Sequence, residues 1–209
     1  MGRYPKVDLD ALARADGVRL REALEALLAF YAEVDALNEL NTRDLNLPCY
    51  RGCDACCHES VFLTPLEFFC VWERVQDTFE DEERFEVVEK GLKLYDKNRD
   101  LIEAFERPPP PGEKDHFSIA RNLRFRCPLL GEHGECRVYP VREMYARLFG
   151  CSFNDEGGVY GCNLVGERLA GKEVTLLKAR AVARRLDELP LTGKRQVYPY
   201  YIHMLYAAK

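Results

Sequence analysis

The chain has 209 residues, of which 47% are hydrophobic and 31% charged, and its formal net charge is −5. This composition is typical of one globular domain with ample material for a core, and it excludes extensive disorder. The acidic balance, without a long run of lysine or arginine, argues against nucleic acid and anionic membranes as partners.

The N-terminal residues and the hydropathy pattern favour a cytoplasmic location. The chain begins Met1-Gly2-Arg3-Tyr4 and turns acidic without the apolar region of a signal peptide. No stretch has the roughly 18 uninterrupted apolar residues that a membrane-spanning helix needs. Because cytoplasmic thiols stay reduced, nine cysteines, an odd number, favour metal binding over disulfides.

Helical periodicity dominates the first half of the chain. Apolar residues recur every three or four positions over residues 18–40, which predicts an amphipathic helix that Asn46-Leu47-Pro48 then ends. Thr64-Pro65-Leu66-Glu67 has the pattern of a capping box and predicts a helix over residues 65–77. An acidic start and an apolar stripe predict a third helix over residues 81–106.

The second half of the chain is more irregular. Prolines at 108–111 predict a stiff loop leading to His116, and the glycine-rich stretch 127–162 is expected to hold one short helix over 141–149. An amphipathic helix is expected over 173–189, and the tyrosine-rich tail 197–206 is expected to pack back on the body as helix or extended chain. The sequence therefore predicts a mainly α fold, a single irregular helical domain over residues 1–209.

The first group of cysteines occupies nine residues of an expected loop, 49–57. Its members are Cys49, Cys53, Cys56 and Cys57. Four thiols at this density must lie within a few ångströms of one another, and clustered thiolates are ligands of zinc and of iron-sulfur clusters. Adjacent cysteines diverge unless the backbone bends sharply, so Cys56 and Cys57 would bind one tetrahedral ion awkwardly. A polynuclear cluster, or two separate sites, would accommodate both.

The second group spreads over residues 127–162, among glycines that provide turns. Its members are Cys127, Cys136, Cys151 and Cys162. We expect the fold to bring segments 49–57 and 127–162 together into one loop-built metal site. Eight thiolates are enough to complete one cluster with several left over, or to fill two four-coordinate sites. Cys70 lies in an apolar helical segment and is expected to be a core residue.

Arginines and histidines near the cysteines in sequence could either act at the metal site or be ordinary surface residues. Arg142 and Arg147 are candidates for binding the cofactor, since guanidinium groups stabilise the negative charge of a thiolate cluster, but they also fit ordinary surface charge. Arg51 and Arg137 share that pattern. His58 and His133 are close enough in sequence to replace a thiolate, although with eight cysteines present we expect them to face solvent or to lie behind the ligands.

Two resemblances follow from these motifs. The spacing Cys49-x3-Cys53-x2-Cys56 equals the three-cysteine pattern with which radical S-adenosylmethionine enzymes hold a four-iron cluster, but the strand and helix alternation of those enzymes is missing. Cys53-Asp-Ala-Cys56-Cys57, Cys127-Pro-Leu-Leu and Cys136-Arg-Val-Tyr-Pro, over about residues 45–165, resemble the cysteine-cluster family described as zinc- or iron-chelating domains. That family has a further cysteine where this chain has Ala146, and Cys151 or Cys162 is expected to compensate.

The family resemblance also extends to the larger flagellin lysine N-methylases. It implies an iron-sulfur cluster, [4Fe-4S] in type, a possible role for S-adenosylmethionine in methyl transfer, and a protein substrate or partner. The leading hypothesis is therefore an iron-sulfur protein with a redox or methyl-transfer role. The alternative is a module that binds Zn²⁺ for structure or for metal handling, without catalysis.

Overall fold

The computed structural model describes residues 4–50, 52–109, 111–112, 120 and 122–207. Among these residues it has eight α-helices, two 3-10 helices and five short strands, so the mainly α fold is confirmed. The α-helices are α1 (Leu9–Ala15), α2 (Leu20–Thr42), α3 (Pro65–Thr78), α4 (Asp81–Ala104), α6 (Met144–Leu148), α7 (Asn163–Leu169), α8 (Ala179–Leu186) and α9 (Tyr198–Tyr206). The 3-10 helices are η1 (Ala55–His58) and η2 (Tyr139–Val141).

The strands form two small sheets that tie distant segments together. They are β1 (Phe62–Leu63), β2 (Ser152–Phe153), β3 (Val159–Tyr160), β4 (Leu177–Lys178) and β5 (Gln196–Val197). Strand β1 pairs with β5 in antiparallel register, Phe62 opposite Val197. Strand β2 pairs with β3 in antiparallel and with β4 in parallel orientation. These pairings anchor the loops on either side of the cysteine segments.

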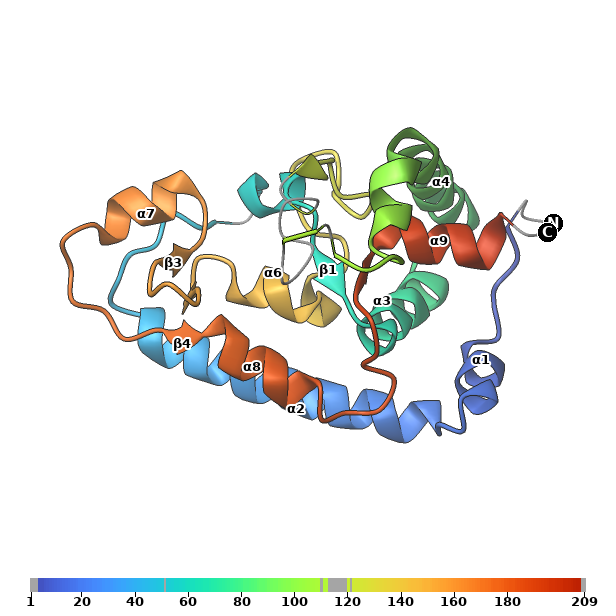
Figure 1. The fold of residues 1–209 in the computed structure, drawn as a ribbon, viewed down its shortest axis with the longest axis horizontal. Coiled ribbons are helices and arrows are strands. Elements are labelled where there is room, and N and C mark those ends of the chain that lie inside the picture. Colours follow the sequence, from blue (N-terminus) through green and yellow to red (C-terminus); the bar gives the residue numbers. More distant parts are fainter. Residues whose placement is uncertain (1–3, 51, 110, 113–119, 121, 208–209) are drawn as a thin grey trace.

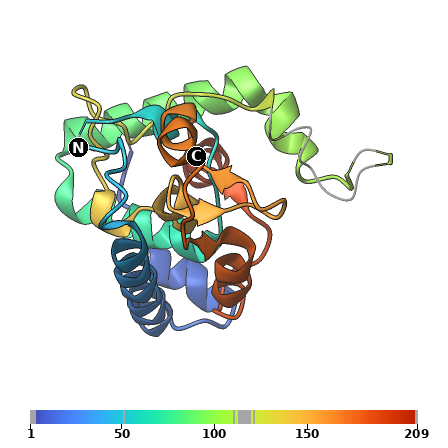
Figure 2. The ribbon, with the colours of Figure 1, turned by 90° about the vertical axis from the view of Figure 1, so that its left-hand side faces the viewer.

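The helices surround the central α6 in two groups (Figure 1). Helix α2 runs along one edge of the molecule with α8 beside it, and α4 packs against α9 on the opposite side, as Figure 2 also shows. Helix α3 lies between these groups and carries the fully buried Trp72 and Phe68. None of the described helices combines the length and the apolar character needed to cross a membrane.

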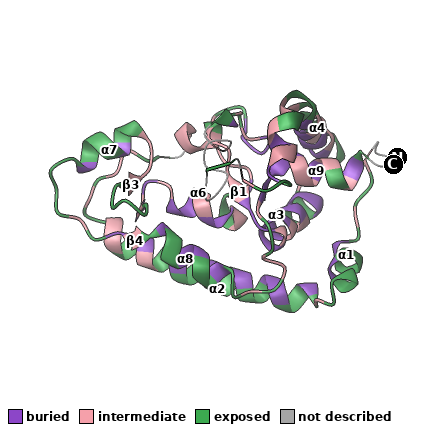
Figure 3. Cartoon of the chain, in the orientation of Figure 1, coloured by how far each residue is buried: buried purple, intermediate pink, exposed green. Residues whose placement is uncertain are grey.

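The core follows from the periodicity of the helices. In α2, Leu20, Leu24, Leu27, Tyr31 and Val34 are buried, which is the three- and four-residue spacing of one helix face. Figure 3 shows the buried residues on the inward-facing sides of α2, α3 and α6, with the exposed ones turned outward. A main cluster built on α2 and α3 is accompanied by two smaller ones, one of them on α7.

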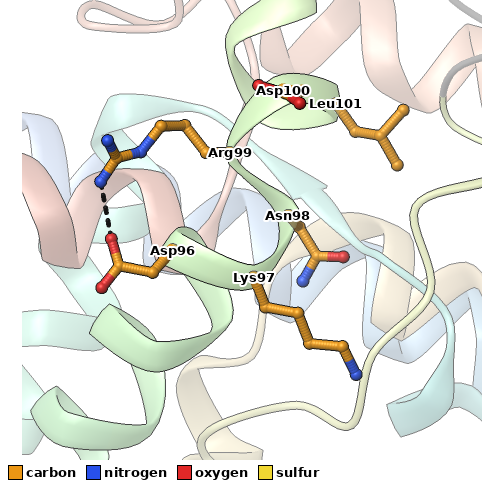
Figure 4. A pocket seen from close by; sticks show the side chains of 6 residues that line it. All are labelled: Asp96, Lys97, Asn98, Arg99, Asp100 and Leu101. Atoms are coloured by element: carbon orange, nitrogen blue, oxygen red, sulfur yellow. Dashed lines mark hydrogen bonds and ion pairs between the residues drawn. The ribbon is translucent and has the colours of Figure 1, made fainter.

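The ends of α3 and α4 are fixed by capping. In α3 the Thr64 hydroxyl accepts from Glu67 N at 3.2 Å, and the Glu67 carboxyl accepts from Thr64 N at 2.8 Å, so the predicted capping box is confirmed. Helix α4 has a similar arrangement between Glu80 and Glu83. It is interrupted at Asn98, which Figure 4 shows beside Lys97 and Arg99. The Asn98 side chain donates to Leu94 O at 2.8 Å.

Helices α2 and α3 lie within two residues of their predicted bounds, and three other predicted helices are shorter in the structure. The helix expected over 173–189 is wrong in its first part: residues 177–178 form β4, and α8 covers only Ala179–Leu186. Pairing with β2, and burial of Leu176 against α7, outweigh the helical pattern there. The expected helix 141–149 shortens to α6, because η2 takes its first residue, and the one expected over 81–106 ends at Ala104. The tail does pack on the body, as helix α9. His116 and Arg51 lie outside the described residues.

Candidate metal centre

Eight of the nine cysteines line one cavity of about 790 Å³. They are the eight predicted ligands, Cys49, Cys53, Cys56, Cys57, Cys127, Cys136, Cys151 and Cys162. Cys70 is 4% exposed within α3, packs in the main core and does not line the cavity. The predicted meeting of segments 49–57 and 127–162 is therefore present.

Two tight turns shape the first cysteine group. Cys53 N donates to Tyr50 O at 2.9 Å, and Gly52 between them has φ +97°, which favours glycine. Cys57 N donates to Asp54 O at 2.8 Å at the start of η1. The sharp bend that adjacent cysteines require is thus supplied by a 3-10 turn, and both Cys56 and Cys57 reach the cavity.

A backbone contact joins the second group to the first. Cys127 N donates to Cys57 O at 2.7 Å, and Leu130 N donates to Cys127 O at 3.2 Å. Leu130 then forms an isolated bridge with Cys136, which returns the chain to the cavity. A Cβ added at Gly134 would lie 2.5 Å from Gly52 O, so the two turns pack backbone to backbone. These contacts hold Cys127 and Cys136 beside Cys57.

The β2–β3 hairpin and the start of α7 bring in the last two cysteines. Gly150 N donates to Tyr160 O at 2.6 Å, which closes the hairpin between Cys151 and Cys162. Cys162 is the N-cap residue of α7. A Cβ added at Gly150 would lie 3.9 Å from Cys49 Sγ, so Cys49 reaches this hairpin from the other side of the cavity.

The thiols differ in their readiness to ionise. A hydrogen bond from the Cys57 thiol lowers the pKa of Cys56 to about 7, and the same bond raises the pKa of Cys57. Desolvation by the surrounding protein is the main cause that raises the pKa of the partly exposed Cys49 and of Cys136, each to about 11. Burial also raises the pKa of Cys127 and of Cys151. Among the thiols with shifted pKa values, Cys56 therefore ionises most readily. Binding of a metal or a nearby cation would favour ionisation of Cys49, Cys57, Cys127, Cys136 and Cys151 near neutral pH.

Arg142 is the cationic side chain placed for that role. It lines the cavity, and its charge lowers the pKa of Cys56, Cys136 and Cys151 against the effect of burial. Its guanidinium stacks on the Tyr139 ring at 4.2 Å. The buried Nε has no hydrogen-bond partner among the described residues, so it remains available to an anionic group in the cavity.

Arg147 was a candidate for binding the cofactor, but it lies behind the cavity wall and not in it. It is 3% exposed, pairs with Asp35, donates to Arg142 O at 2.7 Å and to Pro140 O at 2.6 Å, and stacks over Tyr31. It is not among the residues that line the cavity. Its contacts position the segment that carries Arg142, so its action on a cofactor would be indirect.

The three histidines that the structure describes do not line the cavity. His58 is exposed and pairs with Asp54 at 3.1 Å, while His133 is exposed in the turn before Cys136. Neither lines the cavity, as expected with eight thiols present. His203 stacks on Tyr95 in the contact between α9 and α4.

Sequence reasoning missed a buried polar pair at the cavity wall. Glu143, 5% exposed, accepts a hydrogen bond from Tyr198 OH at 2.5 Å, and both residues line the cavity. Burial raises the pKa of the Glu143 carboxyl. The position of Glu143 next to Arg142 in the sequence could have suggested a place near the cavity. Tyr198 lies 55 residues further along the chain, and no local pattern connects it with Glu143.

The eight cysteines share one cavity without converging on a single point. Among the described residues, no three histidine, cysteine, aspartate or glutamate side chains lie together in a way that could hold a single metal ion.

Comparisons with family models, with curated proteins and with solved structures found no match to this chain. The interpretation of the site therefore depends only on the residues that form it.

Proposed function

We propose that this protein is an iron-sulfur protein whose cysteine-lined cavity holds a cluster of the [4Fe-4S] type. The observation that carries the proposal is the selection of thiols: eight cysteines from four stretches of chain line one cavity, and the ninth, Cys70, lies in the core. Unrelated buried cysteines would not gather in this way. An iron-sulfur cluster, when bound, supplies one-electron transfer or, with an open iron, a binding position.

Two features favour a cluster over zinc. Cys56 and Cys57 are adjacent and share a hydrogen bond, and neighbouring thiolates are better suited to two different irons than to one tetrahedral ion. Arg142 adds positive charge and a buried, unpartnered N–H beside thiolates that carry net negative charge. A zinc module without catalysis is the alternative, and its closed four-thiolate sites would lend the loops folding free energy.

Reconstitution tests the choice of metal. Metal-free, reduced protein is incubated without oxygen, either with ferrous iron and sulfide or with Zn²⁺, and its visible absorption is recorded. The proposal predicts a brown protein with broad sulfur-to-iron absorption that persists after gel filtration, equally in wild type and in the Cys70→Ala control. Tight binding of zinc together with failure to retain iron and sulfide would reject it.

Methyl transfer remains a separate proposal that rests only on the family resemblance. It implies that S-adenosylmethionine binds near the cluster and that a protein lysine accepts the methyl group. Equilibrium dialysis of the iron-loaded protein against labelled S-adenosylmethionine tests it. Absence of binding at millimolar concentration would remove methyl transfer and leave an iron-sulfur protein of redox or structural role.

A further inference from the structure

Arg142 differs from the neighbouring Arg137 and Arg147 in having a donor that the protein leaves unpaired. Arg137 forms an ion pair of 2.6 Å outside the cavity, and Arg147 pairs with Asp35 and donates to two backbone carbonyl groups. The buried Nε of Arg142 has no hydrogen-bond partner among the described residues, and Arg142 lines the cavity. A buried N–H group without an acceptor is costly, so we expect this one to meet an acceptor that enters the cavity.

The ring of Tyr139 orients the guanidinium group of Arg142. The guanidinium carbon lies 4.2 Å from the centre of this ring, and both residues line the cavity. Tyr139 is 59% exposed, so the stacked pair lies where the cavity meets solvent. Stacking on one face leaves the N–H groups in the plane of the guanidinium free to donate side by side. A planar carboxylate is an acceptor that matches this fork.

The cavity is larger than one cluster requires. Its volume of about 790 Å³ lies in the range of small-molecule sites. At roughly 30 Å³ for each atom, which is the share of one water molecule in the liquid, four irons and four sulfides would occupy about 240 Å³. More than half of the cavity therefore remains for a second occupant beside the cluster.

Apolar side chains form much of the cavity wall and indicate the character of that occupant. They are Leu47, Val61, Leu129, Val138, Phe149 and Val165. Hydrocarbon gains free energy when it leaves water for such a wall. The cavity therefore suits an anion with an aliphatic body better than a small inorganic ion.

The charges on the cavity wall favour a ligand with a single negative charge. The charged residues that line the cavity are Arg43, Glu135, Arg142 and Glu143. Arg43 pairs with Asp44 at 3.3 Å, so Arg142 is the cation that the described wall residues leave for a ligand. A dianion such as phosphate would meet one unpaired cation and two carboxylates, whereas a monocarboxylate matches the charge of Arg142.

We propose that the cavity binds a small aliphatic monocarboxylate beside the cluster, with its carboxylate on Arg142 and its chain against the apolar wall. The inference rests on the proposed function, because it names the class of ligand that fits the space next to an iron-sulfur cluster. Arg142 then serves both groups: its charge stabilises the thiolates, and its Nε–H donates to the ligand carboxylate.

Calorimetry on the iron-loaded wild-type protein tests the ligand class. Sodium hexanoate is titrated into the protein, with hexanamide and inorganic phosphate as controls. We expect saturable binding of hexanoate and at least about tenfold weaker binding of both controls, since the amide lacks the charge and phosphate lacks the hydrocarbon. Equal binding of either control, or no binding of hexanoate at millimolar concentration, would overturn the inference.

Arg142→Lys separates the two roles of Arg142, because lysine keeps the positive charge and loses the planar fork. Arg137→Lys is the matched control. We expect the affinity for hexanoate to fall at least about tenfold in Arg142→Lys, with iron and sulfide content equal to wild type. The control should keep both properties. Wild-type affinity for hexanoate in Arg142→Lys would count against the proposed site.

The iron and sulfide content of the same samples keeps the two proposals apart. Iron-loaded protein that fails to bind hexanoate would reject the carboxylate site and leave the iron-sulfur assignment in place. Protein that retains no iron but binds hexanoate through Arg142 would reject the cluster and support the carboxylate site.

Discussion

Cys56 and Cys57 are neighbours in the chain and share one hydrogen bond between their sulfurs, which makes their proton chemistry unequal. In the metal-free protein, the hydrogen bond from Cys57 lowers the pKa of Cys56 to about 7, whereas desolvation raises the pKa of Cys49 and of Cys136 to about 11. Because the thiolate is the reactive form, iodoacetamide at pH 7 should label Cys56 well before Cys49 and Cys136. Mass spectrometry of timed samples measures this order, and faster labelling of the more exposed Cys49 would contradict it.

Arg142 should strengthen metal binding through charge alone, without being a ligand. Replacement of Arg142 by Gln removes the cation that favours ionisation of Cys56, Cys136 and Cys151. We expect metal affinity to fall by about 10- to 100-fold, with helix content unchanged. Competition with a chelator measures the affinity.

Arg137→Gln is the matched control for that variant. Arg137 directly follows Cys136, but its guanidinium pairs with Glu83 at 2.6 Å and stacks on Phe79, and it does not line the cavity. Its replacement should leave metal affinity within about twofold of wild type, since its charge is paired outside the cavity. Equal losses in both variants would mean that Arg142 acts through the fold.

At the scale of elements, the carboxyl group of Glu67 joins three helices. It accepts from Thr64 N at the start of α3, from Tyr31 OH of α2 at 2.9 Å, and from Met144 N of α6 at 2.8 Å. Glu67→Ala would leave these buried donors unpaired, at about 1–3 kcal/mol each. We expect the free energy of unfolding to fall by more than about 3 kcal/mol, measured by urea denaturation. Glu73→Ala, which breaks only an exposed pair with Arg21, should cost under about 1 kcal/mol.

Helices α4 and α9 can pack closely because Gly91, at their contact, has no side chain. A Cβ at Gly91 would lie 2.5 Å from the Ile202 side chain, so Gly91→Ala should push α9 away and destabilise the fold by about 1–3 kcal/mol. Gly166→Ala in α7 meets nothing within 4 Å and should be neutral or slightly stabilising. Thermal unfolding of the two variants compares them, and equal melting temperatures would contradict the role of Gly91.

Local sequence signals predicted elements well where the elements are fixed by local chemistry. The Thr64–Glu67 capping box gave the start of α3 correctly, because its hydrogen bonds lie within four residues. The start of α8 was missed, since Leu177 is held in a parallel pair with Ser152, a contact that no short-range pattern encodes. Helices α1 and α7 were also missed, and both are only seven residues long.

At the scale of the whole molecule, the sequence predicted which cysteines form the candidate site but not how they are arranged in space. The dense first group and the turn-rich surroundings of the second indicated the eight cysteines that line the cavity, and the apolar helical surroundings of Cys70 indicated a core residue. Their arrangement around the cavity depends on tertiary contacts such as the one between Cys57 and Cys127, which are far apart in the chain. The Glu143–Tyr198 pair likewise exists only through tertiary packing.

The most direct test of this account is the iron, zinc and acid-labile sulfide content of the chain purified without oxygen, together with its visible spectrum. We predict a brown protein with iron and sulfide in equal amounts, about four of each per chain, and little zinc. A colourless protein that carries zinc, or no metal at all, would contradict the central claim that the cysteine-lined cavity holds an iron-sulfur cluster.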